Sequence, residues 1–258
     1  MTVADPYPPI GVMRTCFTEK FGAPRQSLMV SEARGVLKLR PDPAFRQALN
    51  HLGSFSHLWV VFVFDKHLQK GWRATIRPPR VEGPRRVGVF ASRSPHRPNP
   101  IGLSAVKLEG IDLDAPGGIE IHLSGVDILD GTPVLDIKPY LPFADSIPDA
   151  TAGWAEGPIE RYPVEYSTAA LRVIQESGVR RHPHLRTLIT QMLEWDPRPR
   201  SQRSAIPIRE PLSEGKRFGF NIFDFDVQWE IRAGGIYVLD LAEKSVKSES
   251  VHRPMSEL

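Results

Sequence analysis

Residues that could do chemistry are concentrated in a few short stretches of the chain. In ASRSPHRPNPIGLS (91–104), Arg93, His96 and Arg97 stand among three prolines. Proline fixes its own φ angle and drives the preceding residue toward extended conformations, so this stretch has few accessible conformations. A stiff, cationic segment is typical of an anion-binding surface, and equally of a structural corner. His96 has the intrinsic pKa of a general base, but a lone histidine among prolines is more often an exposed polar residue.

The second stretch is LDGTPVLDIKPY (129–140), which contains a turn followed by alternating polar residues. Its turn is formed by Asp130, Gly131, Thr132 and Pro133. Asp136 and Lys138 occupy alternate positions of a strand and therefore share a face. One interpretation is a plain β-turn with an ion pair beside it. The other is a turn and a carboxylate that line a pocket.

Two further segments place polar groups at the ends of apolar runs. Arg25 and Gln26 follow Pro24 in EKFGAPRQ, where they are either an ordinary surface loop or a cationic group and an amide presented to a ligand. Asp65 and Lys66 come directly after a strongly apolar run, where pocket walls are commonly built.

Composition and charge are those of a soluble globular protein with an uneven distribution of arginine. The 258 residues are 41% hydrophobic and 24% charged, with a net charge of +3 and 25 prolines. Two groups of arginines indicate a polyanionic partner such as nucleic acid. They are Arg73, Arg77, Arg80, Arg85, Arg86, Arg93 and Arg97 in the first group, and Arg198, Arg200, Arg203 and Arg209 in the second.

The sequence lacks the features of several common classes. It has no apolar run long enough for a bilayer, no secretory pattern and a single cysteine, Cys16, which we expect to be a half-buried strand residue. We therefore expect a cytoplasmic protein without a disulfide. No metal-ligand spacing is present, and neither are the glycine motifs of dinucleotide and ATP sites or the motifs of zinc proteases and esterases.

Hydrophobic patterning predicts a mainly β protein, α+β overall, with two domains. Strands are expected at 10–15, 58–64, 86–91, 101–108, 119–123, 126–129 and 134–137, with the run 58–64 buried on both faces and a short helix within 41–53. So many strands with few helices favour an antiparallel or mixed barrel or sandwich. Beyond residue 150, helices are expected at 167–176 and 183–195, with Gly178 as a stop, followed by one hairpin that turns at 233–235. We expect domains at 1–150 and 165–245 and a frayed tail at 246–258.

Several motifs together closely resemble one family over nearly the whole chain. They are EKFGAPRQ, FSHLWVVFVFDKH, GWRATIRPPR, VGVFASRSPHRPNPIGLS and DGTPVLDIKPYLPFADSIPDA, with DPRP and FDFDVQWEI in the C-terminal part. The sequence is similar to the TsaA-like (TrmO/YaeB) tRNA methyltransferases. The resemblance implies a single-sheeted β-barrel with a smaller C-terminal domain, for which the patterning predicts a helix-plus-hairpin unit, and a homodimer. It also implies S-adenosylmethionine-dependent methylation of N6 of threonylcarbamoyladenosine at position 37, in the anticodon loop of tRNA.

The resemblance also implies the residues of the cofactor site. They are Gln26, Ser27, Leu28, Asp65, Lys66, Arg93, Leu103, Asp130, Gly131, Thr132 and Pro133. The general base does not carry over, and Pro95-His96 varies within the family. From the polar residues of the two best-matching motifs we expect Asp136, Tyr140 or Asn99 to accept the N6 proton or orient the base. We expect Arg198 and Arg200 to contact tRNA phosphates. The alternatives are an RNA-binding barrel without catalysis and a proline-motif interaction module.

Overall fold

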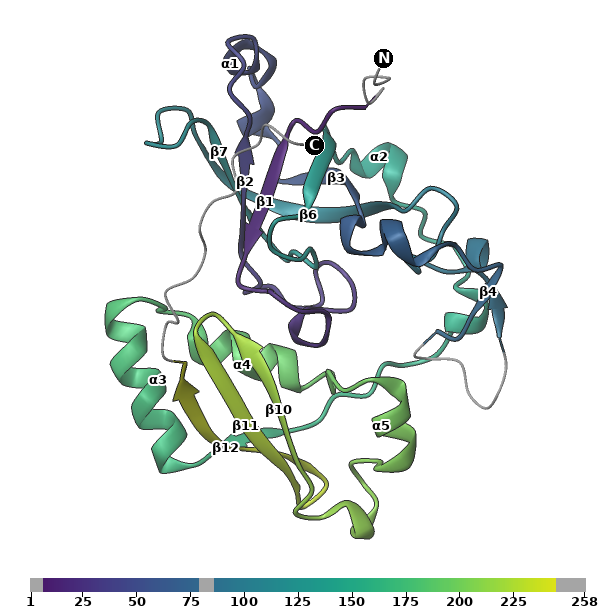
Figure 1. The fold of residues 1–258 in the computed structure, drawn as a ribbon, viewed down its shortest axis with the longest axis vertical. Helices are drawn as coiled ribbons and strands as arrows, with labels where there is room; N and C mark the ends of the chain where they lie inside the picture. The colour runs from purple at the N-terminus through teal and green to yellow at the C-terminus, as the bar shows by residue number, and fades with distance from the viewer. Residues whose placement is uncertain (1–6, 79–85, 245–258) are drawn as a thin grey trace.

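The N-terminal part of the chain is a closed six-stranded barrel. The computed structural model describes residues 7–78 and 86–244, so the expected tail at 246–258 lies outside the described residues. The barrel order is β1-β2-β7-β6-β3-β8, and all neighbours are antiparallel. Its strands are β1 (Gly11–Thr15), β2 (Gly35–Leu39), β3 (His57–Val63), β6 (Ile101–Asp112), β7 (Glu120–Ser124) and β8 (Pro133–Pro139). The mainly β fold expected from the patterning and the single-sheeted barrel implied by the family resemblance are both confirmed (Figure 1).

The barrel interior is filled by alternate residues of each strand. In β3, Leu58, Val60 and Phe62 are buried inside, while the outward residues between them are only half-buried. The expectation that this strand is buried on both faces is wrong, because a barrel made of one sheet gives each strand a single interior face. Gly102 is needed beside this core, since a Cβ atom there would lie 2.3 Å from the ring of Phe62.

Some expected strands are shorter or absent. Of residues 86–91 only β5 (Val87–Gly88) is a strand, which pairs with β4 (Thr75–Ile76) before a 3₁₀ turn at Val89–Ala91. Residues 126–129 form no strand, although Val126 and Ile128 are buried. Burial of an apolar run thus does not require strand pairing. The helices of this part are α1 (Phe45–Ala48) and α2 (Pro142–Asp145).

The C-terminal unit, residues 164–243, is a four-stranded sheet with helices. The sheet order is β10-β11-β12-β9, with β9 parallel to β12, and α3 packs against β12 and α4. The elements are β9 (Val164–Tyr166), α3 (Thr168–Arg180), α4 (Leu185–Leu193), α5 (Arg200–Ala205), β10 (Arg217–Ile222), β11 (Phe225–Arg232) and β12 (Gly235–Glu243).

In the C-terminal unit, the length of α3 and the number of strands differ from expectation, while the last turn is as expected. Helix α3 begins with Ser167 as its N-cap, whose side chain accepts a hydrogen bond from the Ala170 N–H, but it continues through Gly178 to Arg180. The run FGFNIFDFDVQWEI is two strands, because a turn at Phe223 (φ 50°) divides it. The turn between β11 and β12 is confirmed, with Ala233 and Gly234 at positive φ.

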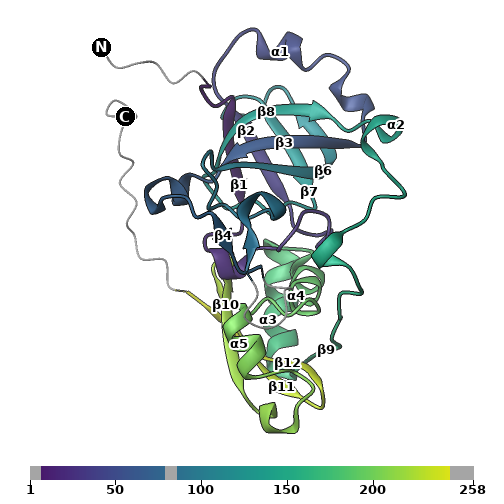
Figure 2. The ribbon, with the colours of Figure 1, turned by 90° about the vertical axis from the view of Figure 1, so that its right-hand side faces the viewer.

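The C-terminal unit lies at one end of the barrel. The segment that follows β1, residues 16–34, lies between the two, as the purple chain below β1 shows in Figures 1 and 2. We call this segment the β1–β2 loop. Buried residues of the barrel, of this loop and of the C-terminal unit belong to one connected hydrophobic core.

Candidate functional site

The β1–β2 loop carries Gln26, Ser27 and Leu28 in a constrained conformation. Leu28 has a φ of 64°, in the left-handed region that costs a non-glycine residue of order 1–3 kcal/mol. Its N–H donates to the carbonyl of Gly125 at 2.8 Å. Gly125 itself has a φ of 69°, and a Cβ atom there would meet the Leu28 side chain at 2.7 Å. The loop is therefore docked closely on the residues that follow β7.

Arg93 joins the proline-rich segment to the β1–β2 loop. Its guanidinium donates to the Gln26 side-chain oxygen at 2.6 Å, while the Gln26 amide nitrogen donates to the Arg25 carbonyl. Arg97, in contrast, donates to the carbonyls of Val89 (3.1 Å) and Ser92 (2.7 Å) and so closes its own segment. The stretch 91–104 is thus a structural corner at Arg97, and at Arg93 it is joined to the β1–β2 loop.

Asp65 and Lys66 lie beside the turn that precedes β8. They begin the 3₁₀ segment Asp65–Lys70, one residue after the end of β3, and the Lys66 ammonium is 3.5 Å from the Asp130 carbonyl. The Asp130 carboxylate accepts the Thr15 N–H at 3.1 Å and lies 3.4 Å from Arg14. Because that carboxylate is bound to β1, its role is to hold the turn in place.

The same turn is fixed to β1 by its backbone. The Gly131 N–H donates to the Met13 carbonyl at 2.9 Å, and the Met13 N–H donates to the Thr132 carbonyl at 2.9 Å. Gly131 has a φ of 79°, which explains why glycine follows Asp130. The next residue, Pro133, begins β8.

Leu103 lies on the outer face of β6, opposite Val61 of β3, and is 56% exposed. Together with exposed Leu28 it supplies apolar surface near the polar loops. The candidate site therefore combines apolar side chains, the Gln26 amide, the Asp65 carboxylate and the cationic groups of Lys66 and Arg93. This donor set fits S-adenosylmethionine, which carries an adenine ring, a carboxylate and two positive centres.

Asp127, which is not among the residues expected from the sequence, is a buried carboxylate near this site. Its Oδ1 accepts a 2.6 Å hydrogen bond from the Ser104 hydroxyl. Desolvation raises the pKa of Asp127, and hydrogen bonds from Ser104 and the Ser27 backbone oppose that rise, as does the charge of Arg93. An acidic residue in the otherwise apolar run GVDIL was the signal that could have revealed it.

The three expected catalytic residues lie at different places. Asn99 is exposed beside the start of β6, where the Phe64 N–H donates to the neighbouring Pro100 carbonyl, so it lies at the end of the barrel that carries Asp65. Asp136 pairs with Val61 on the outer face and forms a 2.6 Å ion pair with Lys138, as the first interpretation of this stretch predicted. Leu103 of β6 lies on the same face, because both residues pair with Val61 of β3. Two strand spacings separate them, which is about 10 Å.

Tyr140 lies at the other end of the barrel. Its N–H donates to the His57 carbonyl at 2.9 Å, and its ring packs 5.5 Å from that of Trp59. Strand β3 separates His57 from Asp65, a length of about 20 Å. Within one chain, the structure does not bring Tyr140 to the cofactor segments.

His67 and His96 pack edge to face with ring centroids 5.1 Å apart. Burial, followed by the charges of Lys70, Lys20 and His96, lowers the pKa of His67 to about 4. Burial and the charges of Arg73 and Lys20 likewise lower the pKa of His96. The His67 ring is therefore neutral at pH 7. Nδ1 of His96 is buried without a hydrogen-bond partner in the described part of the chain.

Several further expectations can be compared with the described residues. Arg198 is only 4% exposed, so it is not a phosphate contact. Cys16 is buried just after β1, and burial raises its pKa to about 12. Arg80 and Arg85 of the first basic group lie outside the described residues. Within residues 7–78 and 86–244 there is no metal-binding group of His, Cys, Asp or Glu, and no helix is long and apolar enough to cross a membrane.

Comparison with known proteins identifies the fold and then the family. A crystal structure of TrmO from P. aeruginosa shares the barrel and the C-terminal unit, with a TM-score of 0.73 and 40% identity over 94% of this chain and 99% of that one. The chain is therefore one of the closed β-barrel proteins with an appended α+β unit. Residues 12–146 match the tRNA-methyltransferase O N-terminal domain, and residues 159–244 match the TrmO C-terminal domain. The chain belongs to the tRNA-methyltransferase O family.

Two relatives of similar length carry functional names. The tRNA (adenine(37)-N6)-methyltransferase of Escherichia coli is 41% identical over 233 residues, which are 90% of this chain and 95% of that protein. A candidate S-adenosylmethionine-dependent methyltransferase of Pseudomonas aeruginosa, RcsF, is 46% identical over 235 residues, covering 91% and 96%. The family resemblance stated from the sequence motifs is confirmed.

Proposed function

We propose that this protein transfers a methyl group from S-adenosylmethionine to N6 of threonylcarbamoyladenosine at position 37 of tRNA. Methylation of N6 of adenine 37 is the activity named for the E. coli relative, and the threonylcarbamoyl group is our more specific assignment. The observation that best supports the proposal is that the proposed cofactor segments contact one another at one end of the barrel. Arg93 donates to Gln26, and Lys66 lies beside the Asp130 carbonyl.

The cofactor residues are proposed to divide their roles by chemistry. Gln26 and Asp65 offer hydrogen-bond acceptors, Arg93 and Lys66 offer cationic donors, and Leu103 offers an apolar surface. When bound there, S-adenosylmethionine supplies a methyl group on a positively charged sulfur. Ser27, Leu28 and residues 130–133 are the remaining members of the proposed set. Holding donor and acceptor in line contributes on the order of 7–11 kcal/mol to such reactions.

The acceptor nitrogen must lose its proton as the new bond to carbon forms. N6 is weakly nucleophilic because its lone pair is shared with the ring and the carbamoyl group. Among the proposed catalytic residues, Asp136 is the carboxylate that can take the proton, on the same outer face as Leu103. Asn99 can orient the base, since an amide donates and accepts hydrogen bonds but takes no proton.

A homodimer is part of this proposal. Ile101 and Leu103 are 46% and 56% exposed and lie two residues apart on the outer face of β6. Exposed apolar surface of this kind is typical of an interface between subunits. A catalytic role for Tyr140 would require a second subunit, because the proposed cofactor segments of the same chain lie at the other end of the barrel. A sedimentation experiment that finds only monomers at the concentrations used for assays would exclude the dimer.

Residues 1–150 are proposed to bind the cofactor and catalyse, and residues 165–245 to contact tRNA. Of the two expected phosphate contacts, Arg198 is buried, so the proposal keeps Arg200, at the start of α5. The variant Arg200→Glu should then lower the slope of log affinity against log salt by about 0.7 for one lost single-strand phosphate contact. An unchanged slope would exclude this placement.

Calorimetric titration with S-adenosylmethionine tests the enzyme against its two alternatives. A barrel that only binds RNA and a proline-motif module both lack a site for this ligand. We expect saturable binding of one cofactor per chain. Absence of binding at millimolar cofactor would contradict the proposed function.

A further inference from the structure

The β1–β2 loop is held by the C-terminal unit on both sides of its cofactor segment. On one side, the Arg25 guanidinium donates to the main-chain carbonyls of Asp196 and, at 2.9 Å, Arg198. On the other side, the Trp195 indole N–H donates to the Met29 carbonyl at 3.0 Å. The residues between these two anchors are Gln26, Ser27 and Leu28. Both anchors are attached to one short stretch, 195–198.

The stretch that receives Arg25 is itself rigid. The buried Arg198 side chain donates to both carboxylate oxygens of Asp196, at 2.7 and 2.8 Å, and to the Ile206 carbonyl at 2.9 Å. Its guanidinium also lies 4.6 Å from the centre of the Phe218 ring. Such a paired, stacked arginine is fixed in position, so the carbonyls that accept from Arg25 are fixed as well.

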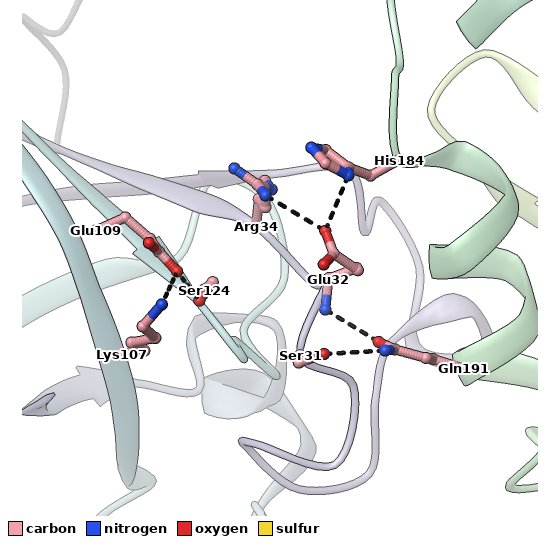
Figure 3. Close-up of polar contacts among 8 residues, drawn as sticks. All are labelled: Ser31, Glu32, Arg34, Lys107, Glu109, Ser124, His184 and Gln191. Carbon is pink, nitrogen blue, oxygen red and sulfur yellow. Dashed lines mark hydrogen bonds and ion pairs between the residues drawn. The ribbon is translucent and has the colours of Figure 1, made fainter.

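The outer end of the same loop is attached by a separate set of contacts, shown in Figure 3. The Gln191 side chain accepts the Glu32 N–H at 3.0 Å and donates to the Ser31 hydroxyl at 2.9 Å. Glu32 also lies 3.5 Å from His184. These contacts join the loop to α4 but begin three residues beyond Leu28. The Glu32–His184 contact among them offers a control within the same interface.

We infer that Arg25 is a positioning residue for cofactor binding, through which the C-terminal unit holds Gln26, Ser27 and Leu28 in their binding conformation. This inference rests on the proposed cofactor contacts. Arg25 remains a cation at neutral pH, although burial, followed by the charge of Arg203, lowers its pKa to about 10. A loop that is ordered before binding loses less conformational entropy when the ligand arrives. Apparent affinity falls in proportion to the fraction of molecules with the loop in place.

The experiment compares Arg25→Ala and Arg25→Lys with Glu32→Gln. We expect Arg25→Ala to raise the Kd for S-adenosylmethionine about tenfold, which corresponds to a tenfold smaller ordered fraction. The kcat at saturating cofactor should stay within about twofold, since Arg25 touches no reacting atom. Arg25→Lys keeps the charge but not the forked donor, so its Kd should lie between those of the wild type and Arg25→Ala. The Kd of Glu32→Gln should equal that of the wild type.

Two results would overturn the inference. One is a wild-type Kd for Arg25→Ala. The other is an equal loss of affinity in Glu32→Gln, which would indicate a general loosening of the interface. Hydrogen exchange without cofactor gives an independent readout. In the Arg25→Lys variant, the amides of residues 26–29 should exchange faster than in the wild type.

The exchange measurement also covers the cases in which the first experiment fails. If Arg25→Ala does not fold, Arg25→Lys still decides whether the loop is held. If the wild type does not bind S-adenosylmethionine, the proposed function fails, while exchange rates still test the anchoring of the loop. Unchanged exchange in Arg25→Lys would contradict that anchoring.

Discussion

The guanidinium of Arg93 donates a 2.6 Å hydrogen bond to the side-chain oxygen of Gln26, 67 residues away in the sequence. This bond joins the proline-rich segment to the β1–β2 loop. Within residues 7–78 and 86–244 it is the one hydrogen bond of the Arg93 side chain, whose guanidinium has five N–H donors. The pair therefore fixes the two segments relative to each other and still presents a positive charge to a ligand.

Replacing Arg93 by alanine should weaken cofactor binding by about tenfold, the typical loss for a hydrogen bond to a charged group. Calorimetry of S-adenosylmethionine binding measures this directly. Arg86→Ala is a suitable control, since Arg86 is also exposed but donates to Thr75 in the β4 region. Equal affinities of the Arg93→Ala and wild-type proteins would exclude Arg93 as a contact.

Asp136→Asn should slow methyl transfer by about 100-fold or more, because removal of a general base typically costs at least that factor. A single-turnover assay isolates this step from product release. Lys138→Met serves as the control, as it removes the partner of the Asp136–Lys138 ion pair and keeps the carboxylate. If Asp136→Asn retains the wild-type rate, Asp136 is not the base.

Arg198→Ala should lower the free energy of unfolding by about 3–5 kcal/mol, since it leaves the buried Asp196 carboxylate unpaired. Urea unfolding measures the change. Arg209→Ala breaks an exposed ion pair with Glu160 and should cost less than about 1 kcal/mol. A loss for Arg198→Ala no larger than that for Arg209→Ala would contradict the structural role assigned to Arg198.

The protein should lose stability as the pH falls below 6.5, in part through His67. The pKa of His67 is lowered to about 4 in the fold, so between pH 6.5 and 4 the unfolded chain binds more protons than the folded one. The free energy of unfolding therefore decreases as the pH falls through this window. Urea unfolding at pH 7 and pH 5 should show a smaller decrease for His67→Gln than for the wild type. The same decrease in both would contradict the assignment.

The sequence was most informative where local chemistry determines structure. The turns at 130–133 and 233–234 and the Asp136–Lys138 pair follow from residue types and strand alternation, and all are present. What it could not predict depends on contacts between distant segments. Residues 126–129 have the apolar pattern of a strand, yet Val126 donates to the Ala33 carbonyl of the β1–β2 loop.

Charged residues illustrate the same limit. Arg198 lies in a basic stretch that is typical of a phosphate-binding surface, but Asp196, Phe218 and the Ile206 carbonyl bury it. The pairing of Arg93 with Gln26 spans 67 residues, and no local pattern reports it. Family motifs, by contrast, named both residues as cofactor contacts, which remains a prediction.

The central claim is tested most directly by mass spectrometry of tRNA nucleosides after incubation with the protein and S-adenosylmethionine that carries a deuterated methyl group. Two tRNA preparations should be compared, one with threonylcarbamoyladenosine at position 37 and one with unmodified adenosine there. We predict one labelled methyl group on threonylcarbamoyladenosine and none on the unmodified adenosine. No labelled nucleoside, or a label at another position of the tRNA, would contradict the account.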